Sequence, residues 1–212
     1  VDINYTVEEK SSDQLELSAG WGGGIGLTGT LGVTFNNFSI KNIFRKTSWD
    51  PLPTGDGQKL SLRFQSNGRF FRSLNFSFTE PWLGGKKRNS FSFNVFNTKF
   101  TNAYNPYTGL YDRAFADSSF LSTSGVTLAL GKQLKWPDDF FSLVTSLSYI
   151  QYKAKNYSIF PSFSTGVSNN FNLKLALQRA SIDQPIFPRS GSNFMLSGTF
   201  TPPWSYIKGI NK

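Results

Sequence analysis

The chain has 212 residues, enough for one large β domain or two small ones, and it contains neither Cys nor His. Their absence excludes a disulfide framework, thiolate and His-rich metal sites, and Ser-His-Asp or Cys-His catalysis within these residues, so we expect no enzyme, no cofactor and no metal site. The net charge is +9. The basic residues are scattered apart from one short cluster, Lys86-Lys87-Arg88, so we expect no nucleic acid partner.

The hydrophobicity of the chain favours strands over helices. Aromatic residues make up 17% of a sequence whose mean hydropathy is −0.30, which suits alternating strands better than buried helices. No apolar run approaches the roughly 18 residues of a transmembrane helix. There is no signal peptide and Val1 is not an initiator, so we expect an internal piece of a longer protein.

The first ten residues differ in polarity from the rest. Within 1–10, apolar residues alternate with polar or acidic ones, which predicts a half-buried strand with an acidic outer face. The apolar set is Val1, Ile3, Tyr5 and Val7, and the polar set is Asp2, Asn4, Thr6 and Glu8. Ser11-Ser12 follow as a short hinge. We therefore place a domain boundary there, with 1–10 closing one domain and 11–212 forming another.

The stretch from Asp13 to Phe35 predicts a β-hairpin. Apolar side chains alternate with small or polar ones on both sides of Gly22-Gly23-Gly24, and this triplet supplies the backbone freedom of a tight turn. The first strand of the hairpin is the richest in glycine and is therefore expected to be the least firmly paired.

The same alternation recurs along the rest of the chain. It predicts seven more strands, near residues 59–66, 74–79, 90–95, 126–130, 143–152, 171–178 and 194–200. The connections are rich in Gly, Pro and Asn, with long polar loops at 101–119 and 155–168 and an irregular segment at 36–56. About nine strands thus follow one another in up-and-down order, with no helical period.

Three features favour a transmembrane antiparallel β-barrel over a soluble β sandwich. The strands are long enough to cross a bilayer with tilt, and one face is bulky and apolar while the other is small and polar. Aromatic residues also gather at strand ends, as in two interfacial girdles. They are Phe38, Phe44, Trp49, Trp82, Trp136, Phe140, Phe141 and Trp204. Such strands must close in lipid, and bacterial barrels have even strand numbers, so we expect further strands after Lys212.

Orientation follows if Ser11-Ser12 lie on the periplasmic side. The segments 36–56, 80–89, 132–140 and 183–191 are then periplasmic, and 22–26, 66–70, 102–120 and 155–168 are extracellular. Four cations are expected to face the lumen, where charge is tolerated: Lys59, Arg63, Lys174 and Arg179.

Several stretches resemble the BamA family of outer-membrane β-barrel assembly proteins. Residues 1–9 resemble the end of its last POTRA domain, and LSAGWG (17–22) with GLTG (26–29) resembles its first hairpin. FSFTEPWL (76–83) is similar to a strand end of the family, and FPRSGS (187–192) to its Phe-Pro-x-x-Gly-Ser turn. The matches run in order along nearly the whole chain.

The resemblance implies the first half of a barrel of about sixteen strands, preceded by periplasmic POTRA domains, in a Gram-negative outer membrane. The implied function is folding and insertion of outer-membrane proteins. The implied partners are unfolded outer-membrane proteins, accessory assembly lipoproteins and outer-membrane lipids. TamA-like and two-partner-secretion translocases share this architecture and remain alternatives.

The implied mechanism is strand templating at a lateral gate, the seam between the first and last strands of the barrel. An unpaired sheet edge is a template for another strand, and pairing gains more in lipid than in water. The residues expected to pair with a client strand are Gln14, Leu15, Glu16, Leu17, Ser18, Ala19, Gly20 and Trp21. The aromatics expected at the membrane interface are Phe38, Trp49, Trp82, Trp136, Phe140 and Trp204.

Three other interpretations remain open on the residues alone. The glycines near position 22 can simply make a tight turn. The barrel can be a passive or substrate-specific transport channel, or a barrel enzyme whose His lies elsewhere in the protein.

Overall fold

A computed structural model describes residues 13–22, 26–49, 52–68, 70–85, 89–102, 107–108, 111–157 and 164–203. Four of the expectations above lie outside these residues: the strand at 1–10 with its domain boundary, most of the glycine turn, the cluster Lys86-Lys87-Arg88, and Trp204.

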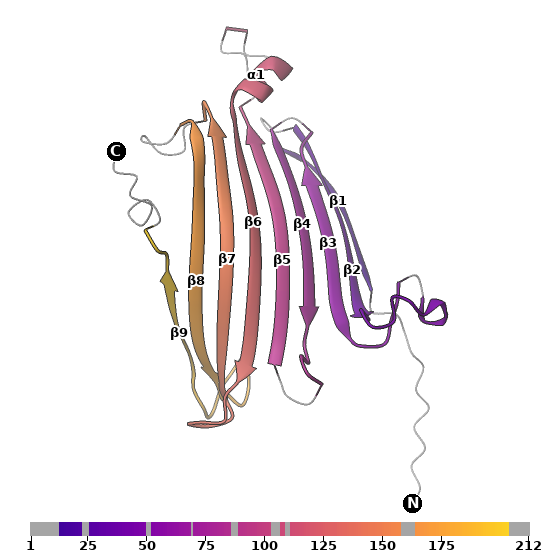
Figure 1. Cartoon of the computed structure of the whole chain (residues 1–212), viewed down its shortest axis with the longest axis vertical. Coiled ribbons are helices and arrows are strands. Elements are labelled where there is room, and N and C mark those ends of the chain that lie inside the picture. The colour runs from indigo at the N-terminus through magenta and orange to yellow at the C-terminus, as the bar shows by residue number, and fades with distance from the viewer. Residues whose placement is uncertain are drawn as a thin grey trace, which may run out of the picture.

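The described chain forms one sheet of nine antiparallel strands that neighbour each other in chain order (Figure 1). This confirms the expected all-β, up-and-down architecture. The strands are β1 Gln14–Gly22, β2 Gly26–Phe38, β3 Gln58–Ser66, β4 Phe71–Glu80, β5 Asn89–Thr101, β6 Phe120–Gln133, β7 Phe141–Lys155, β8 Gly166–Ala180 and β9 Asn193–Phe200. The connections β1–β2, β3–β4, β5–β6 and β7–β8 lie at the end that carries helix α1 (Arg113–Ser118), which we call the α1 end.

The register gives the sheet two chemically different faces. One row of paired residues crosses five strands through Phe78, Phe93, Leu128, Leu147 and Leu173. The neighbouring row carries Ser77, Asn94, Thr127, Ser148 and Asn172. Paired residues share a face and successive residues alternate, so the first row belongs to an apolar face and the second to a polar face.

The two faces also differ in exposure. On the apolar face, Leu62 and Leu128 keep 46% and 42% of their surface exposed, although both lie in interior strands. On the polar face, Thr30 and Leu121 keep only 6% and 8%. Side chains crowd together on the inner side of a curved sheet, so this difference fits an apolar face turned outward and a polar face turned inward.

Strands β5 to β8 are longer than the alternation predicts. They extend toward the α1 end through residues 96–101, 120–125, 153–155 and 166–170, where backbone pairing continues without interruption. These extensions carry mostly polar or charged side chains on the apolar face, such as Asn97, Ser124 and Lys153. The strand signal in the sequence weakens there because the apolar residues change face. Phe100, Leu121 and Ala154 lie in one paired row on the inward face, and Leu121 and Ala154 are buried.

Two connections have more structure than expected. Helix α1 interrupts the loop at 101–119, and the Asp112 carboxylate caps it by accepting a hydrogen bond from Ala114 N at 2.9 Å. The segment after β2 contains a 3-10 turn at Lys46–Ser48 and is folded around the fully buried Ser39, whose Oγ donates to Asp56 at 2.5 Å. In the described part of the chain, no helix has the length and apolarity needed to span a membrane.

One of the four expected lumen cations lies on the wrong face. Arg179 is paired with Phe141 and Phe194, so it shares the apolar face with Leu177. Lys174, five residues earlier, lies on the polar face, as do Lys59 and Arg63. An odd spacing along a strand always reverses the face, so the expectation for Arg179 was wrong.

Candidate functional site

Strand β1 is one edge of the sheet. It pairs with β2 along its whole length, from Gln14 opposite Thr34 to Gly22 opposite Gly26. No other strand of the described chain pairs with its second edge. All eight residues predicted to pair with a client, Gln14 to Trp21, therefore lie on one strand that has a free edge among the described residues.

The side chains of β1 are weakly covered. Leu15, Leu17 and Trp21 keep 72%, 77% and 79% of their surface exposed, well above the value for Leu62 in β3. They lie on the apolar face with a neighbouring strand on one side only. At Gly20, an added Cβ would meet nothing within 4 Å. Strand β1 is thus held mainly by its backbone bonds to β2.

One side-chain contact ties β1 to a strand beyond its neighbour. Glu16 Oε1 accepts a hydrogen bond from Arg63 Nη2 of β3 at 2.9 Å, and the two side chains form an ion pair on the polar face. Gly32 of β2 lies between them in the same row. An added Cβ at Gly32 would lie 3.2 Å from Glu16 Oε2 and 3.7 Å from Arg63 Cγ. The glycine therefore leaves the space that this contact crosses.

A second contact fixes the start of β1. Asp13 Oδ1 accepts a hydrogen bond from Asn36 N of β2 at 3.1 Å. On β2 and β3, Thr34 and Ser61 are joined by their hydroxyl groups at 2.9 Å on the polar face. These contacts and the Glu16–Arg63 pair lie at the half of the β1–β2 hairpin that is farther from the α1 end, so the other half of β1 is held by backbone pairing.

The five described aromatics of the expected interface set all lie at the end opposite α1. Trp49, Trp82, Trp136 and Phe140 are exposed there, in the connections β2–β3, β4–β5 and β6–β7. Phe38 is buried and packs edge-to-face on Phe78, with ring centroids 6.3 Å apart. These described residues form one group rather than two girdles. At the α1 end, the exposed Trp21 takes the corresponding place on β1.

A cluster around Arg179 joins two connections at the end opposite α1. Its guanidinium donates to Asp138 Oδ2 at 2.9 Å and to Ser181 Oγ at 2.6 Å, and it also contacts Ser192. The rings of Phe140 and Phe141 lie 5.7 and 5.8 Å from Arg179 Cζ. This arginine on the apolar face is thus neutralised by a carboxylate and packed between aromatic rings.

The FPRSGS segment forms a turn around Asp183. This carboxylate accepts hydrogen bonds from the backbone N of Gln184, Arg189 and Ser190 at 2.9, 2.9 and 3.2 Å. The amide groups of Ser190 and Arg189 hold the pKa of Asp183 below its usual value. Gly191 has φ +92°, and an added Cβ would lie 2.1 Å from Ser181 O, so only glycine fits there. The FPRSGS motif alone does not reveal the role of Asp183, which lies four residues before it.

The chemistry of the described site is that of a sheet edge. Groups of three or more His, Cys, Asp or Glu side chains that could hold a metal are absent among the described residues. What β1 offers is a row of backbone N–H and C=O groups along its second edge, and such a row can accept another strand.

Comparison with protein families shows where this sheet belongs. A family model described as the Omp85 superfamily domain matches residues 54–209. The chain belongs to the Omp85 superfamily. As an Omp85 chain it is an outer-membrane protein, and the apolar face of its sheet is the side that meets lipid. No match was found among curated proteins. The match begins after β2, so the Omp85 model covers β3 to β9 and leaves out the hairpin that carries Glu16 and Gly32.

Proposed function

We propose that this Omp85 chain is the first part of the barrel of a BamA-type assembly protein, which folds and inserts β-barrel proteins into the outer membrane. Periplasmic POTRA domains would precede it, and further strands would close the barrel, about sixteen in all. Its partners would be unfolded outer-membrane proteins, accessory lipoproteins and the surrounding lipid.

The observation that carries the proposal is the edge position of β1. In lipid, an unpaired backbone group costs several kcal/mol, so a strand that can leave its own closing partner offers a strong template to an incoming strand. The seam between β1 and the last strand of the barrel is the lateral gate. We propose that Gln14 to Trp21 form the pairing surface and that a client's terminal strand replaces the closing strand there.

The side chains of β1 suit such an exchange. Apart from the Glu16–Arg63 ion pair, few side-chain contacts on the described strands would hold β1 in one place. Gly20 and Gly22 lie at the α1 end of the strand, where loss of pairing costs the fewest side-chain contacts. Opening would therefore begin at the α1 end and stop at the ion pair.

The orientation of the sheet across the outer membrane is part of the same proposal. If β1 leaves a periplasmic domain, the connections at the end opposite α1 are periplasmic and the α1 end is extracellular. Exposed Trp49, Trp82, Trp136 and Phe140 would then anchor the periplasmic interface, where amphipathic rings sit at the level of the headgroups.

Transport is the second candidate, and the polar face supports it. Hydroxyl and amide groups line that face from β2 to β8, and pairs such as Thr127–Ser148 and Ser73–Thr98 are hydrogen bonded at 3.1 and 3.0 Å. A wet lumen of this kind suits a TamA-like or two-partner-secretion translocase or a channel as well as an assembly protein.

Reconstitution separates the two candidates. The full-length protein is placed in liposomes, and two rates are measured: folding of an added unfolded barrel protein, read by heat-modifiable mobility, and release of an entrapped solute. Assembly activity requires the folding rate to rise severalfold over empty liposomes without a matching release of solute. Fast release with no effect on client folding would contradict the proposal and support a channel.

A further inference from the structure

Three cations share one row on the apolar face near the α1 end. Arg72 of β4 is paired with Lys99 of β5, Lys99 with Ser122 of β6, and Ser122 with Lys153 of β7. We call Arg72, Lys99 and Lys153 the cation row. Neighbouring strands lie about 4.8 Å apart, so the row spans about 15 Å across the outward surface.

The cation row lies just beyond the apolar band. The row before it carries Asn97, Ser124, Gln151 and Asn169 on the same face. These side chains bond to one another: Asn97 Nδ2 donates to Ser124 Oγ at 2.8 Å, and Gln151 Nε2 to Asn169 Oδ1 at 3.1 Å. Tyr149 lies one row deeper and points its hydroxyl to Asn169 Oδ1 at 2.9 Å.

This order of residues marks a membrane boundary. Phe93, Val95 and Tyr149 lie on the apolar side, the bonded polar row follows, and the cations come next. A tyrosine whose ring is apolar and whose hydroxyl meets polar groups is typical of the interface. The cation row therefore lies at the level of the lipid headgroups rather than in the hydrocarbon.

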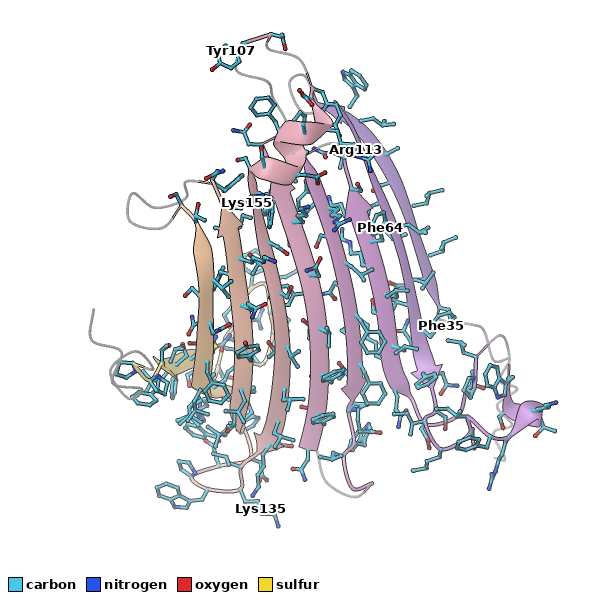
Figure 2. The ribbon with its side chains drawn as sticks, turned by 45° about the horizontal axis from the view of Figure 1, so that its top comes forward. Phe35, Phe64, Tyr107, Arg113, Lys135 and Lys155 are labelled. Carbon is cyan, nitrogen blue, oxygen red and sulfur yellow. The ribbon has the colours of Figure 1, made fainter. Side chains whose placement is uncertain are left out.

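The cations of the row have no carboxylate partner among the described residues. The connecting segments at 66–70, 102–111 and 156–165 contain no Asp or Glu either. Two acidic residues, Asp112 and Asp117, lie at this end in the α1 segment. Asp112 caps the helix, and Asp117 lines one hollow with Arg72 and Lys99 without an ion pair to either among the described residues. Figure 2 shows this end with Arg113 and Lys155, two further cations, labelled.

The contrast with the other cations of the chain is informative. Arg179 lies on the same face at the opposite end and is bound to Asp138 at 2.8 Å, and Arg63 is bound to Glu16. In the cation row, Arg72 and Lys99 instead lie directly opposite each other, an arrangement that destabilises a sheet unless an anion lies between them. Lys99 is held on the surface by the Phe120 ring, 4.6 Å from its ammonium.

We propose that the cation row binds the phosphate groups of an outer-leaflet glycolipid headgroup. Arginine and lysine are the usual ligands of phosphate, and a row about 15 Å long can meet a headgroup that carries two phosphates. The lipid chains would then lie on the apolar band below the row. The assignment to the outer leaflet rests on the topology of the proposed function, in which the α1 end is extracellular.

The test is lipid binding by the delipidated full-length protein in neutral detergent. Diphosphoryl lipid A is titrated and bound lipid is counted by native mass spectrometry. The triple variant Arg72→Gln, Lys99→Gln, Lys153→Gln is expected to bind at least about tenfold more weakly. A matched triple variant at the opposite end, Lys59→Gln, Lys132→Gln, Lys135→Gln, removes the same charge and should stay within about twofold of wild type.

Two further arms make the outcome decisive. The charge-conserving variant Arg72→Lys, Lys99→Arg, Lys153→Arg should retain binding, and heat-modifiable mobility checks that every variant is folded. Dephosphorylated lipid A should bind alike to wild type and to the Gln triple variant, and phosphatidylglycerol, which carries one phosphate, should lose less affinity than diphosphoryl lipid A. Unchanged affinity of that variant for diphosphoryl lipid A would overturn the proposal, as would an equal loss in the matched control.

The same variants separate this proposal from the proposed function. Client folding by the Gln triple variant is measured in liposomes without glycolipid, where the cation row has no ligand. Normal client folding with lost lipid A binding supports both proposals. Lipid A binding by a wild-type protein that cannot fold clients would count against the assembly function alone.

Discussion

Glu16 of β1 and Arg63 of β3 meet at 2.9 Å across the backbone of Gly32, so the edge strand of the sheet is tied to its second neighbour. An ion pair between adjacent strands would hold only one ladder in register. This pair holds two ladders, β1–β2 and β2–β3, because its ends belong to strands that do not touch. It lies six residues before Gly22, in the half of β1 away from the α1 end.

Removing this pair should loosen β1 without unfolding the barrel. Both side chains are about half exposed, so we expect Glu16→Gln to cost at most about 1 kcal/mol in unfolding free energy. The backbone amides of β1 should exchange up to about fivefold faster, which hydrogen exchange measures peptide by peptide. Lys59→Gln, on the same strand and face as Arg63, should leave β1 unchanged. Equal exchange rates in wild type and Glu16→Gln would show that the pair does not hold the strand.

Gly32 should tolerate a methyl group less well than its neighbour Gly29. At Gly32 the new Cβ lies 3.2 Å from Glu16 Oε2 and 3.3 Å from Glu16 Cβ, whereas at Gly29 the nearest atom is 4.0 Å away. Gly29→Ala should therefore stabilise the protein by about 0.5 kcal/mol through lower chain entropy. Gly32→Ala should be about 1 kcal/mol less stable than Gly29→Ala, measured by denaturant unfolding of the full-length protein. Equal stabilities would contradict the close passage over Gly32.

Gly125 should be intolerant of substitution for a different reason. The Phe96 ring covers it on the polar face, and an added Cβ would lie 2.5 Å from both Cε1 and Cζ of that ring. We expect Gly125→Ala to cost about 1–3 kcal/mol, because the ring must leave its place. In a Phe96→Ala background the same change should cost much less, and a double-mutant cycle measures this coupling. Additive costs would mean that the ring and the glycine act independently.

The turn after β8 should keep its structure in mild acid. Backbone amides lower the pKa of Asp183, so its carboxylate stabilises the turn above the unfolded pKa of about 3.9. This contribution is lost only as the pH falls through the lower pKa of the folded state. The amide resonances of Arg189 and Ser190 should therefore titrate with a midpoint below 3.8, the ordinary value of the group. Asp183→Asn should abolish the titration, and a midpoint above 3.8 in wild type would contradict the assigned hydrogen bonds.

The sequence predicts the order and the two faces of the sheet because one physical cause controls both. In a strand with lipid on one side and a crowded polar interior on the other, apolar and polar residues must alternate. The apolar Leu147 and the polar Ser148 can therefore be assigned to their faces from the sequence. The ends of the strands are predicted less well from the sequence. From Asn97 to Thr101 the outward side chains are polar or charged, and the apolar Phe100 points inward against Phe71, so the pattern of the membrane-spanning part is reversed.

The contacts of the site are harder to read from the sequence. Glu16, Gly32 and Arg63 are far apart in the chain, and only the register of two ladders brings them into one row. The register depends on connections that differ in length and internal structure, such as the folded segment around Ser39. Helix α1 was missed because six residues are too few to show a helical period, although Asp112 carried a capping signal.

The central claim, that β1 is a template for client strands, is tested most directly by cysteine cross-linking in the full-length protein. These 212 residues contain no Cys, so Leu15→Cys, Leu17→Cys and Ala19→Cys can be made singly, with Leu62→Cys in the interior strand β3 as control. Each is oxidised with a stalled client barrel that carries one Cys at successive positions of its terminal strand. We expect each β1 position to cross-link with a single client position. When the β1 site moves by two residues, the client position that reacts should also move by two residues. Leu62→Cys should not react with the client. Cross-links only to the protein's own closing strand, or links to the client without a fixed register, would contradict templating at β1.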